Sequence, residues 1–346
     1  MSTAYTLEPN ASLARRNTLR VDATTRWLAK VHDTAVLPQV LARPELAGLP
    51  VLVLGDGSNL LLAADFPGVM LQIVPARTVF EPRRNGVMRV SIDAGANWDS
   101  TVTRTLDADC AGLENLALIP GLAGAAPIQN IGAYGAEIDS VIESVEAFDR
   151  ESGAACTLTR DECAFGYRDS RFKREIDRWI VTRVHLLLPA THELALDYAG
   201  VREELAAMQV DAPRAADVAA AVRRLRRRKL PDPAEIGNAG SFFKNPVVPA
   251  ATAMTLKTAH PALPVYPAGD HAMRKLSAAW LIESCGWRGH REGDAGISAR
   301  HSLVLVNYGH ATGLQLLDLA RRVAASVEQR YGLRLEPEPR ILGAKF

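Results

Sequence analysis

This sequence has few cysteines and almost no net charge. Its four cysteines form no Cys-x-x-Cys pair and its eight histidines are scattered, so neither residue type predicts a metal site or a disulfide framework. We expect reduced cysteines that mostly pack in the interior. Forty basic and 39 acidic residues leave a formal net charge of +1, which argues against general binding to nucleic acid or to a membrane surface.

Long hydrophobic runs are missing as well. The first residues, MSTAYTLEPNASLARRNTL, contain no apolar signal core, and no later run is long and clean enough to cross a bilayer. We therefore expect a cytoplasmic protein with no membrane-bound part. A hydrophobic content of 48% is ordinary for a globular protein, and a length of 346 residues predicts more than one domain.

The most unusual stretch that is present runs from Asn115 to Ala136, NLALIPGLAGAAPIQNIGAYGA. It has no charged side chain, and its glycines and prolines would break a membrane helix. Glycine permits positive φ angles and close approach of the backbone. One interpretation is a buried, tightly turned connection of the core. The other is a loop that lies against a large flat or phosphorylated ligand and offers backbone N–H groups as donors. The composition alone leaves both open.

A second glycine motif, Gly55-Asp56-Gly57-Ser58-Asn59, follows the apolar run at 51–54, which is predicted to be a buried strand. A Rossmann turn would need a third glycine where Leu60 stands and a helix after it, and the sequence predicts neither. No GxxxxGK[ST] phosphate loop occurs in the sequence. Taken alone, the motif is equally typical of a tight turn held by its Asp, Ser and Asn side chains.

Short strands and helices alternate along the rest of the chain, which predicts a mixed α+β fold. Asn85-Gly86 is a strong hairpin signal, Gly153 marks a second turn between strands, and Thr312 is placed to cap a long helix that Gly332 ends. The expected strands include 26–31, 51–54, 69–74, 180–188 and 302–307, with a strand–turn–strand unit at 141–159; the expected helices are 34–42, 98–109, 211–230, 276–285 and 313–331.

Several polar residues have ordinary explanations when they are taken singly. The helix expected at 211–230 ends in the basic run RRLRRRK, which we interpret as a solvated helix end favoured by the helix dipole, although one cation could meet a ligand phosphate. Ser241 lies in GNAGSFFKNP, without the Gly-x-Ser-x-Gly elbow of a nucleophilic serine. Glu336 and Glu338 flank Pro337 near the C-terminus, where exposed charge is the ordinary interpretation.

Together these motifs are specific. LGDGSN, IPGLAGAAPIQNIGAYG, FGYRDSRFK, GNAGSFFKNP and LEPEPRILG occur in the order of the UDP-N-acetylenolpyruvoylglucosamine reductase family, which the chain resembles from about Asn17 to Gly343. The resemblance implies an FAD-binding fold of the vanillyl-alcohol-oxidase (PCMH) type in two subdomains, 1–75 and 76–230. It further implies a smaller α+β substrate-binding domain at 231–332 and a tail at 333–346 that returns to the FAD domain.

The resemblance also implies a non-covalent FAD, reduced by NADPH, whose pyrophosphate and isoalloxazine are held by backbone amides of both glycine motifs. The implied cofactor-binding residues are Gly55, Asp56, Gly57, Ser58, Asn59, Pro120, Gly121, Gly124, Ala125, Gln129, Asn130, Gly132, Ala133 and Tyr134. The segment LALDY at 194–198 is similar to that of the subtype with an extra tyrosine-bearing loop over the substrate. Tyr198 of this segment is therefore implied to bind substrate, and the resemblance implies the same for Lys229 and Asn245.

The implied reaction is the NADPH-dependent reduction of UDP-N-acetylglucosamine enolpyruvate to UDP-N-acetylmuramate for bacterial peptidoglycan, by a monomeric enzyme. Arg168 matches the guanidinium that stabilises charge developing on the substrate carboxylate. Glu338 matches an acidic group that helps to polarise this carboxylate. Ser241 matches the proton donor to the second carbon, which needs a relay because a hydroxyl is a weak acid; Lys229, Asn245 and water are candidates for it.

Two other functions stay open. One is another FAD oxidase or dehydrogenase on the same fold, which has little support because no His or Cys stands where covalent flavin attachment is expected. The other is a non-catalytic protein that binds a nucleotide sugar and carries no flavin. Visible absorption of the purified protein separates this binding protein from both enzymes.

Overall fold

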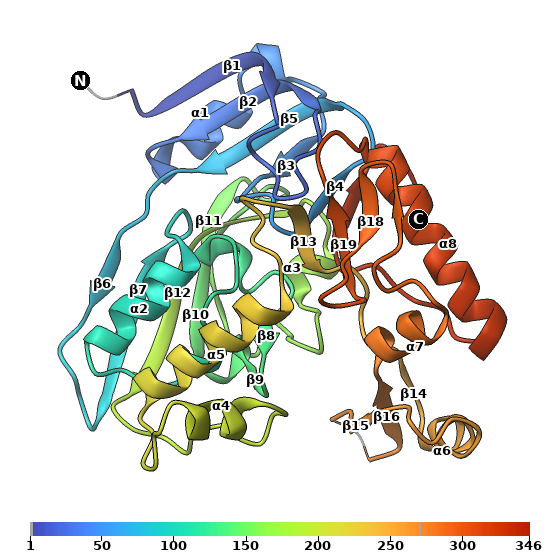
Figure 1. Ribbon diagram of the computed structural model, residues 1–346. Coiled ribbons are helices and arrows are strands. Elements are labelled where there is room, and N and C mark those ends of the chain that lie inside the picture. Colours follow the sequence, from blue (N-terminus) through green and yellow to red (C-terminus); the bar gives the residue numbers. More distant parts are fainter. Residues whose placement is uncertain (1–2, 270) are drawn as a thin grey trace. The chain divides into compact units, whose positions relative to one another are not determined.

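The computed structural model describes residues 3–269 and 271–346, and the chain forms two compact units (Figure 1). The first unit consists of Met1–Ala11, Thr25–Asp56 and Pro67–Arg227, and the second consists of Ser12–Thr24, Gly57–Phe66 and Arg228–Phe346. Each unit therefore combines segments that are far apart in the sequence. The sequence predicts four continuous domain segments, and that division stays a prediction. The two units described here are discontinuous.

A four-stranded sheet begins the first unit. Its strand order is β1 (Tyr5–Ser12), β2 (Thr24–Val31), β5 (Phe66–Ile73) and β3 (Val51–Val53). The short helix α1 (Leu37–Leu41) follows a 3-10 turn that Asp33 caps through its side chain. Leu37 and Val40 of this helix pack into the core beneath the sheet. These positions confirm the strands and the helix expected for this part of the chain. The apolar residues whose spacing predicted these elements are the residues that are buried.

A five-stranded antiparallel sheet forms the larger part of the first unit. Its order is β11 (Ala154–Thr159), β10 (Ile142–Asp149), β12 (Trp179–Pro189), β7 (Val87–Asp93) and β6 (Thr78–Phe80). Asn85 and Gly86 have φ angles of +50° and +78° between residues 84 and 87, which bridge the two arms, so they form the predicted hairpin turn. Gly153, with a φ of +71°, makes the predicted turn between β10 and β11.

Helices pack against one face of this larger sheet. They are α2 (Trp98–Asp107), α4 (Val201–Ala207) and α5 (Ala215–Lys229), and Figure 1 shows α2 and α5 in front of the strands. The core between them contains Trp98, Val222 and Leu205. Helix α5 begins at Ala215, four residues later than expected from Asp211, because Pro213 disfavours helical geometry in the residue before it.

Two further sheets lie in the second unit. One has the order β13 (Gly237–Ser241), β19 (Val304–Asn307), β18 (Ala295–Ile297) and β17 (Arg291–Glu292), and the other has the order β14 (Val247–Pro249), β16 (Met273–Leu276) and β15 (Val265–Pro267). The helices of this unit are α6 (Ala250–Ala259), α7 (Ala278–Ser284) and α8 (Gly313–Tyr331). Thr312 and Gln315 form a capping box, and Gly332 ends α8 with a φ of +66°, as the sequence predicts.

The C-terminal segment is held by strand pairing within the second unit. β20 (Arg340–Leu342) pairs in parallel with β4 (Leu60–Leu62), which directly follows the GDGSN motif. The end of the chain is therefore docked and not frayed, while its predicted return to the FAD domain stays a prediction. Its partner strand lies in the second unit, although the sequence placed residues 60–62 in the first FAD-binding segment.

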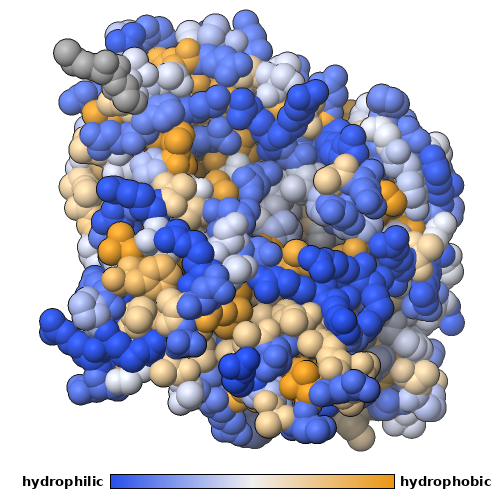
Figure 2. Space-filling view, turned by 60° about the vertical axis from the view of Figure 1, so that its left-hand side comes forward, coloured by the Kyte–Doolittle hydropathy of each residue, from blue (hydrophilic) through white to orange (hydrophobic). Residues whose placement is uncertain are grey.

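The surface of the described residues gives no sign of a membrane-spanning helix. None of the helices within 3–269 and 271–346 is long and apolar enough to span a bilayer. Figure 2 shows one face, on which hydrophilic residues are widely spread and hydrophobic residues occur in small groups among them.

Candidate active site

The glycine-rich stretch packs against the end of β7 in the first unit. Ala123 N–H donates to the Ala96 carbonyl at 2.8 Å, and Gly124 N–H donates to the Ala94 carbonyl at 2.9 Å. A Cβ added to Gly124 would lie 2.5 Å from the Cβ of Ala94. The close approach that glycine permits at position 124 is therefore an approach to protein, as in the first of the two interpretations of this stretch.

The two glycines of the GDGSN motif differ in how much room the protein leaves beside them. In the second unit, Gly57 has a φ of +63°, and a Cβ there would lie 2.3 Å from the carbonyl oxygen of Arg16. Gly55, in the first unit, has no positive φ, and a Cβ there would meet Leu122 at 3.8 Å, an ordinary van der Waals distance. Glycine is thus required at position 57 by the fold, whereas nothing described inside the first unit requires it at position 55.

Asn130 joins the glycine-rich stretch to the segment FGYRDSRFK. Its side chain is fully buried and donates to the Gly166 carbonyl at 3.1 Å and to Glu137 Oε2 at 3.2 Å. Its Oδ1 accepts from the N–H of Asp139 at 3.1 Å. These three bonds are internal to the protein, so they give Asn130 a structural role in addition to the cofactor contact predicted for it.

Arg168 lies directly against the glycine-rich stretch. Its Nη2 donates to the Gly132 carbonyl at 2.5 Å, and its Nη1 lies 3.5 Å from Glu137 Oε1. The guanidinium also lies over the Tyr167 ring, 5.2 Å from the centroid. A Cβ on Gly132 would lie only 2.7 Å from Arg168 Nη1, which explains the glycine at that position. The guanidinium is therefore held from several directions.

The two tyrosines of the predicted site meet in the first unit. The rings of Tyr134 and Tyr198 lie edge to face, with centroids 5.1 Å apart. Asn115 Nδ2 donates to the Tyr134 carbonyl at 2.8 Å and to the Ala195 carbonyl at 2.9 Å, so one buried amide links the segments that carry the two rings. Tyr198 stays 48% exposed. The structure thus places the tyrosine-bearing segment beside the glycine-rich stretch.

Ser241 ends a bulged strand in the second unit. The pairing of β13 with β19 shifts register between Asn238 and Ser241, at Gly240, whose φ is +68°. The buried Asn238 side chain accepts from Gly240 N–H at 3.0 Å and donates to the Pro231 carbonyl at 3.0 Å, which stabilises the bulge. Bulges of this kind re-aim side chains and are common beside active sites. The GNAGS sequence therefore produces the bulge that precedes Ser241 at the end of β13.

Glu338 lies on the segment that pairs with the residues after Ser241. Its N–H donates to the Phe242 carbonyl at 2.8 Å, and Phe243 bridges Pro337. Asn59 Nδ2 donates to the carbonyl of Glu338 at 3.3 Å. The structure therefore gathers a residue of the GDGSN motif, the GNAGSFFKNP motif and the LEPEPRILG motif within the second unit. The neighbouring Glu336 is exposed and forms an ion pair with Lys244 at 3.0 Å.

Lys229 and Asn245 also lie in the second unit. Burial lowers the pKa of the Lys229 ammonium, and the neighbouring charge of Arg228 lowers it further. Asn245 Oδ1 accepts from the N–H of Ala278 at 2.9 Å, at the start of α7. Lys229 is thus a cation held at some electrostatic cost, which a ligand phosphate would relieve, and Asn245 is fixed by a helix N-terminus.

Two charged or titratable residues near these positions were missed in the sequence. Arg226 donates from Nε to the Leu118 carbonyl at 3.1 Å, and burial lowers its pKa while the neighbouring Tyr134 and Asp99 raise it. His301 Nδ1 accepts from Leu303 N–H at 3.3 Å. Burial lowers the pKa of the His301 imidazole most, and the nearby charge of Lys229 lowers it further. The basic run contained Arg226, but helix periodicity alone did not separate it from its solvated neighbours.

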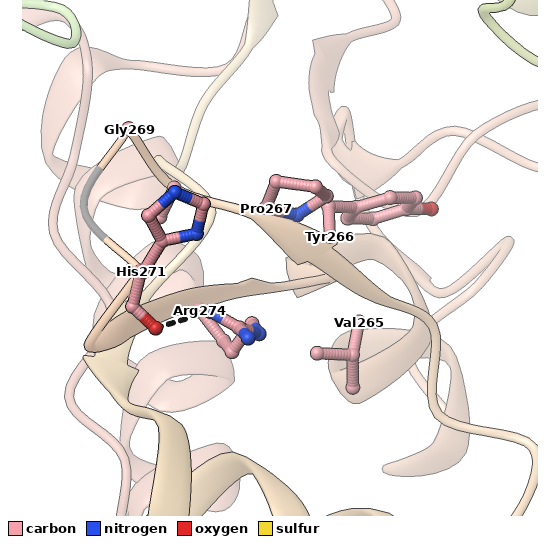
Figure 3. A pocket seen from close by; sticks show the side chains of 7 residues that line it. Val265, Tyr266, Pro267, Gly269, His271 and Arg274 are labelled. Carbon is pink, nitrogen blue, oxygen red and sulfur yellow. Dashed lines mark hydrogen bonds between the residues drawn. The ribbon is translucent and has the colours of Figure 1, made fainter.

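A pocket of about 270 Å³ lies at the hairpin of β15 and β16 in the second unit (Figure 3). Arg274 Nη1 donates to the His271 carbonyl at 2.8 Å at one end of it. The described lining residues are Val265, Tyr266, Pro267, Ala268, Gly269, His271 and Arg274. None of the residues predicted for the site lines this pocket.

Metal and disulfide chemistry have no visible basis in the described chain. Within residues 3–269 and 271–346, no group of three or more His, Cys, Asp and Glu side chains is placed to hold a metal ion. The four cysteines are free, and burial raises the pKa of the Cys163 thiol to about 12, so this thiol is an unreactive packing residue.

Comparison with known proteins decides the family. Residues 26–159 match the model of the FAD binding domain, and residues 232–342 match that of the UDP-N-acetylenolpyruvoylglucosamine reductase C-terminal domain. The UDP-N-acetylenolpyruvoylglucosamine reductase of Xanthomonas euvesicatoria pv. vesicatoria is 55% identical over 344 residues, covering 99% of this chain and 98% of the relative. This chain belongs to the UDP-N-acetylenolpyruvoylglucosamine reductase family.

Other members of the reductase family agree over the same length. The reductase of Xylella fastidiosa (strain M12) is 51% identical over 342 residues, which are 99% of this chain and 97% of the relative. The crystal structure of the Thermus caldophilus reductase superposes with a TM-score of 0.68 at 26% identity, covering 97% of this chain and 99% of that one. The family, the fold class and FAD as the cofactor, all predicted from the sequence, are thereby confirmed.

Proposed function

We propose that this protein reduces the enolpyruvyl ether of UDP-N-acetylglucosamine to UDP-N-acetylmuramate, with NADPH as the reductant and with Arg168, Ser241 and Glu338 as its catalytic residues. As a member of the reductase family it is an FAD-containing oxidoreductase of peptidoglycan precursor synthesis. The observation that carries this assignment is the identity of 55% with the Xanthomonas reductase along almost the whole of both chains.

The residues of the first unit fit a non-covalently bound FAD. The glycine-rich stretch is uncharged and turns often, so it offers backbone N–H groups without competing charge. Arg226 places a largely buried cation near Tyr134, which suits an anionic group of a ligand. FAD bound there would supply the hydride chemistry between NADPH and the substrate. The residues that would hold it are those of the two glycine motifs.

Arg168 would stabilise the negative charge that develops on the substrate carboxylate. Its contacts with Gly132, Glu137 and Tyr167 support this role, because a guanidinium that is already fixed needs no reorganisation when charge develops. A bidentate guanidinium–carboxylate contact also fixes the orientation of the enolpyruvyl group.

Ser241 would donate the proton to the second carbon, and Glu338 would help to polarise the carboxylate. The bulge before Ser241 and the pairing of Glu338 with Phe242 support these roles, because both residues are placed by backbone hydrogen bonds. Lys229, whose pKa burial lowers, is a candidate for the relay that returns a proton to Ser241.

Tyr198, Lys229 and Asn245 would bind the substrate, in the subtype with the extra tyrosine-bearing loop. The edge-to-face contact between Tyr198 and Tyr134 supports this assignment, since it places the loop beside the predicted cofactor residues. We also propose that the enzyme is a cytoplasmic monomer.

Anaerobic half-reactions test the proposed function. The purified protein is expected to be yellow, to release all its FAD on denaturation, to bleach with NADPH and to regain its colour with UDP-N-acetylglucosamine enolpyruvate. A flavoprotein that only oxygen reoxidises would be another oxidase or dehydrogenase. A colourless protein that binds the sugar nucleotide and takes up no FAD would be a non-catalytic binding protein.

Gly55→Ala is expected to weaken FAD binding by about tenfold or more while leaving the thermal midpoint nearly unchanged. The added methyl would meet only Leu122, at an ordinary distance, so the protein itself has room for it. Gly124→Ala is the matched control, because its methyl would collide with Ala94 and cost about 1–3 kcal/mol of stability. Titration of the apoprotein with FAD and thermal melting of both variants measure the two effects. Unchanged FAD affinity in Gly55→Ala would mean that no ligand approaches this backbone.

A further inference from the structure

The segment between β12 and α4 covers the beginning of the glycine-rich stretch. Residues 190–200 form no helix or strand, yet Leu194 and Leu196 pack against the core of the first unit. His192 Nε2 lies 2.5 Å from Glu114 Oε1, and the Ala195 carbonyl accepts from Asn115 Nδ2 at 2.9 Å. Adjacent residues 114 and 115 thus attach this segment at two points, a few residues before Tyr198.

Glu114 is the unusual member of this contact. Its side chain is only 1% exposed, whereas that of His192 is 32% exposed. Glu114 Oε2 accepts from Gly112 N–H at 2.7 Å, and His192 faces the other oxygen. A carboxylate removed from water must be hydrogen-bonded, because an unsatisfied buried charge is far more costly than an exposed one. The contact therefore differs from an ordinary surface ion pair, which contributes little.

We propose that His192 is a positioning residue for the substrate half-reaction, and that its hydrogen bond to Glu114 holds the tyrosine-bearing segment over the glycine-rich stretch. Without His192, Oε1 of the buried Glu114 carboxylate loses its hydrogen bond while Oε2 keeps that from Gly112 N–H, and the simplest relief is for residues 190–198 to lift and admit water to Oε1. Lifting this segment separates Tyr198 from Tyr134, whose rings are now 5.1 Å apart. This inference rests on the proposed role of Tyr198 in binding the enolpyruvyl sugar nucleotide.

His192→Ala is expected to raise KM for UDP-N-acetylglucosamine enolpyruvate by about tenfold, the lower end for a lost bond to a charged group, and to change kcat by less than about threefold. FAD content and the rate of flavin bleaching by NADPH should stay normal, since the segment is proposed to act on the sugar nucleotide. His192→Gln keeps an N–H donor of similar reach and should restore most of the affinity. Glu193→Ala, an exposed neighbour in the same segment, is the matched control and should behave as the parent protein.

Amide hydrogen exchange of residues 190–200 provides a readout that does not depend on the reaction. Exchange in this segment should be faster in His192→Ala than in the parent or in His192→Gln. If the parent showed no substrate-dependent reoxidation while exchange still rose in His192→Ala, the proposed function would fail and the attachment would stand. Unchanged exchange, equal impairment of the Gln and Ala variants, or a parallel loss of FAD would each overturn the positioning role.

Discussion

Replacing Glu338 with glutamine is expected to slow reoxidation of the reduced flavin by UDP-N-acetylglucosamine enolpyruvate by about two to four powers of ten. A positioned charge or proton that acts in the transition state contributes roughly 3–5 kcal/mol, which corresponds to that range of rates. Folding and FAD content should be unaffected, because the backbone bonds that hold this segment do not involve the carboxylate. Stopped-flow absorbance of the pre-reduced protein measures the rate.

Glu336→Gln is the control for this prediction. The two glutamates are separated only by Pro337, but the side chain of Glu336 is 72% exposed and pairs with Lys244. An exposed pair of this kind contributes about 0–1 kcal/mol, so this variant should reoxidise almost as fast as the parent. Equal, mild effects in both variants would mean that the C-terminal segment is only a packed edge and that Glu338 is not catalytic.

Ser241→Ala is expected to separate the two half-reactions. Bleaching by NADPH should proceed at nearly the normal rate, whereas reoxidation by the enolpyruvyl substrate should slow by at least about a hundredfold, the lower end for a lost general acid. The reason is that the hydroxyl is proposed to act only on the second carbon of the substrate. An equal loss in both half-reactions would show that Ser241 positions the cofactor and donates no proton.

Thermal melting must accompany both catalytic variants, because Ser241 and Glu338 lie on paired segments. Phe242 and Glu338 share a backbone hydrogen bond, and β13 pairs with β19 just before it. Removing the Ser241 hydroxyl leaves these backbone bonds in place, so a change in the thermal midpoint of less than about 2 °C is expected for a half-buried hydroxyl. A large drop would assign the rate effect to a displaced strand.

The local elements and the family could be predicted from the sequence. The predicted turns at Asn85-Gly86 and Gly153 and the predicted cap at Thr312 are confirmed. Turns and caps can be predicted because they depend on the backbone preferences of a few neighbouring residues. The family followed from short motifs in a fixed order. The start of α5 differs from the prediction because Pro213 disfavours helical geometry at Ala212, the residue before it.

The contacts among these residues and the need for particular glycines could not be predicted, because both depend on how distant segments pack. Arg168 contacts Gly132, Glu338 contacts Phe242, and His192 contacts Glu114, across separations of 36, 96 and 78 residues. Gly124 is predicted to bind the cofactor, and the structure adds that its missing Cβ makes room for Ala94. Local propensity acts over a few residues, whereas the partner of a buried charge or the neighbour of a glycine is chosen by how the whole chain packs.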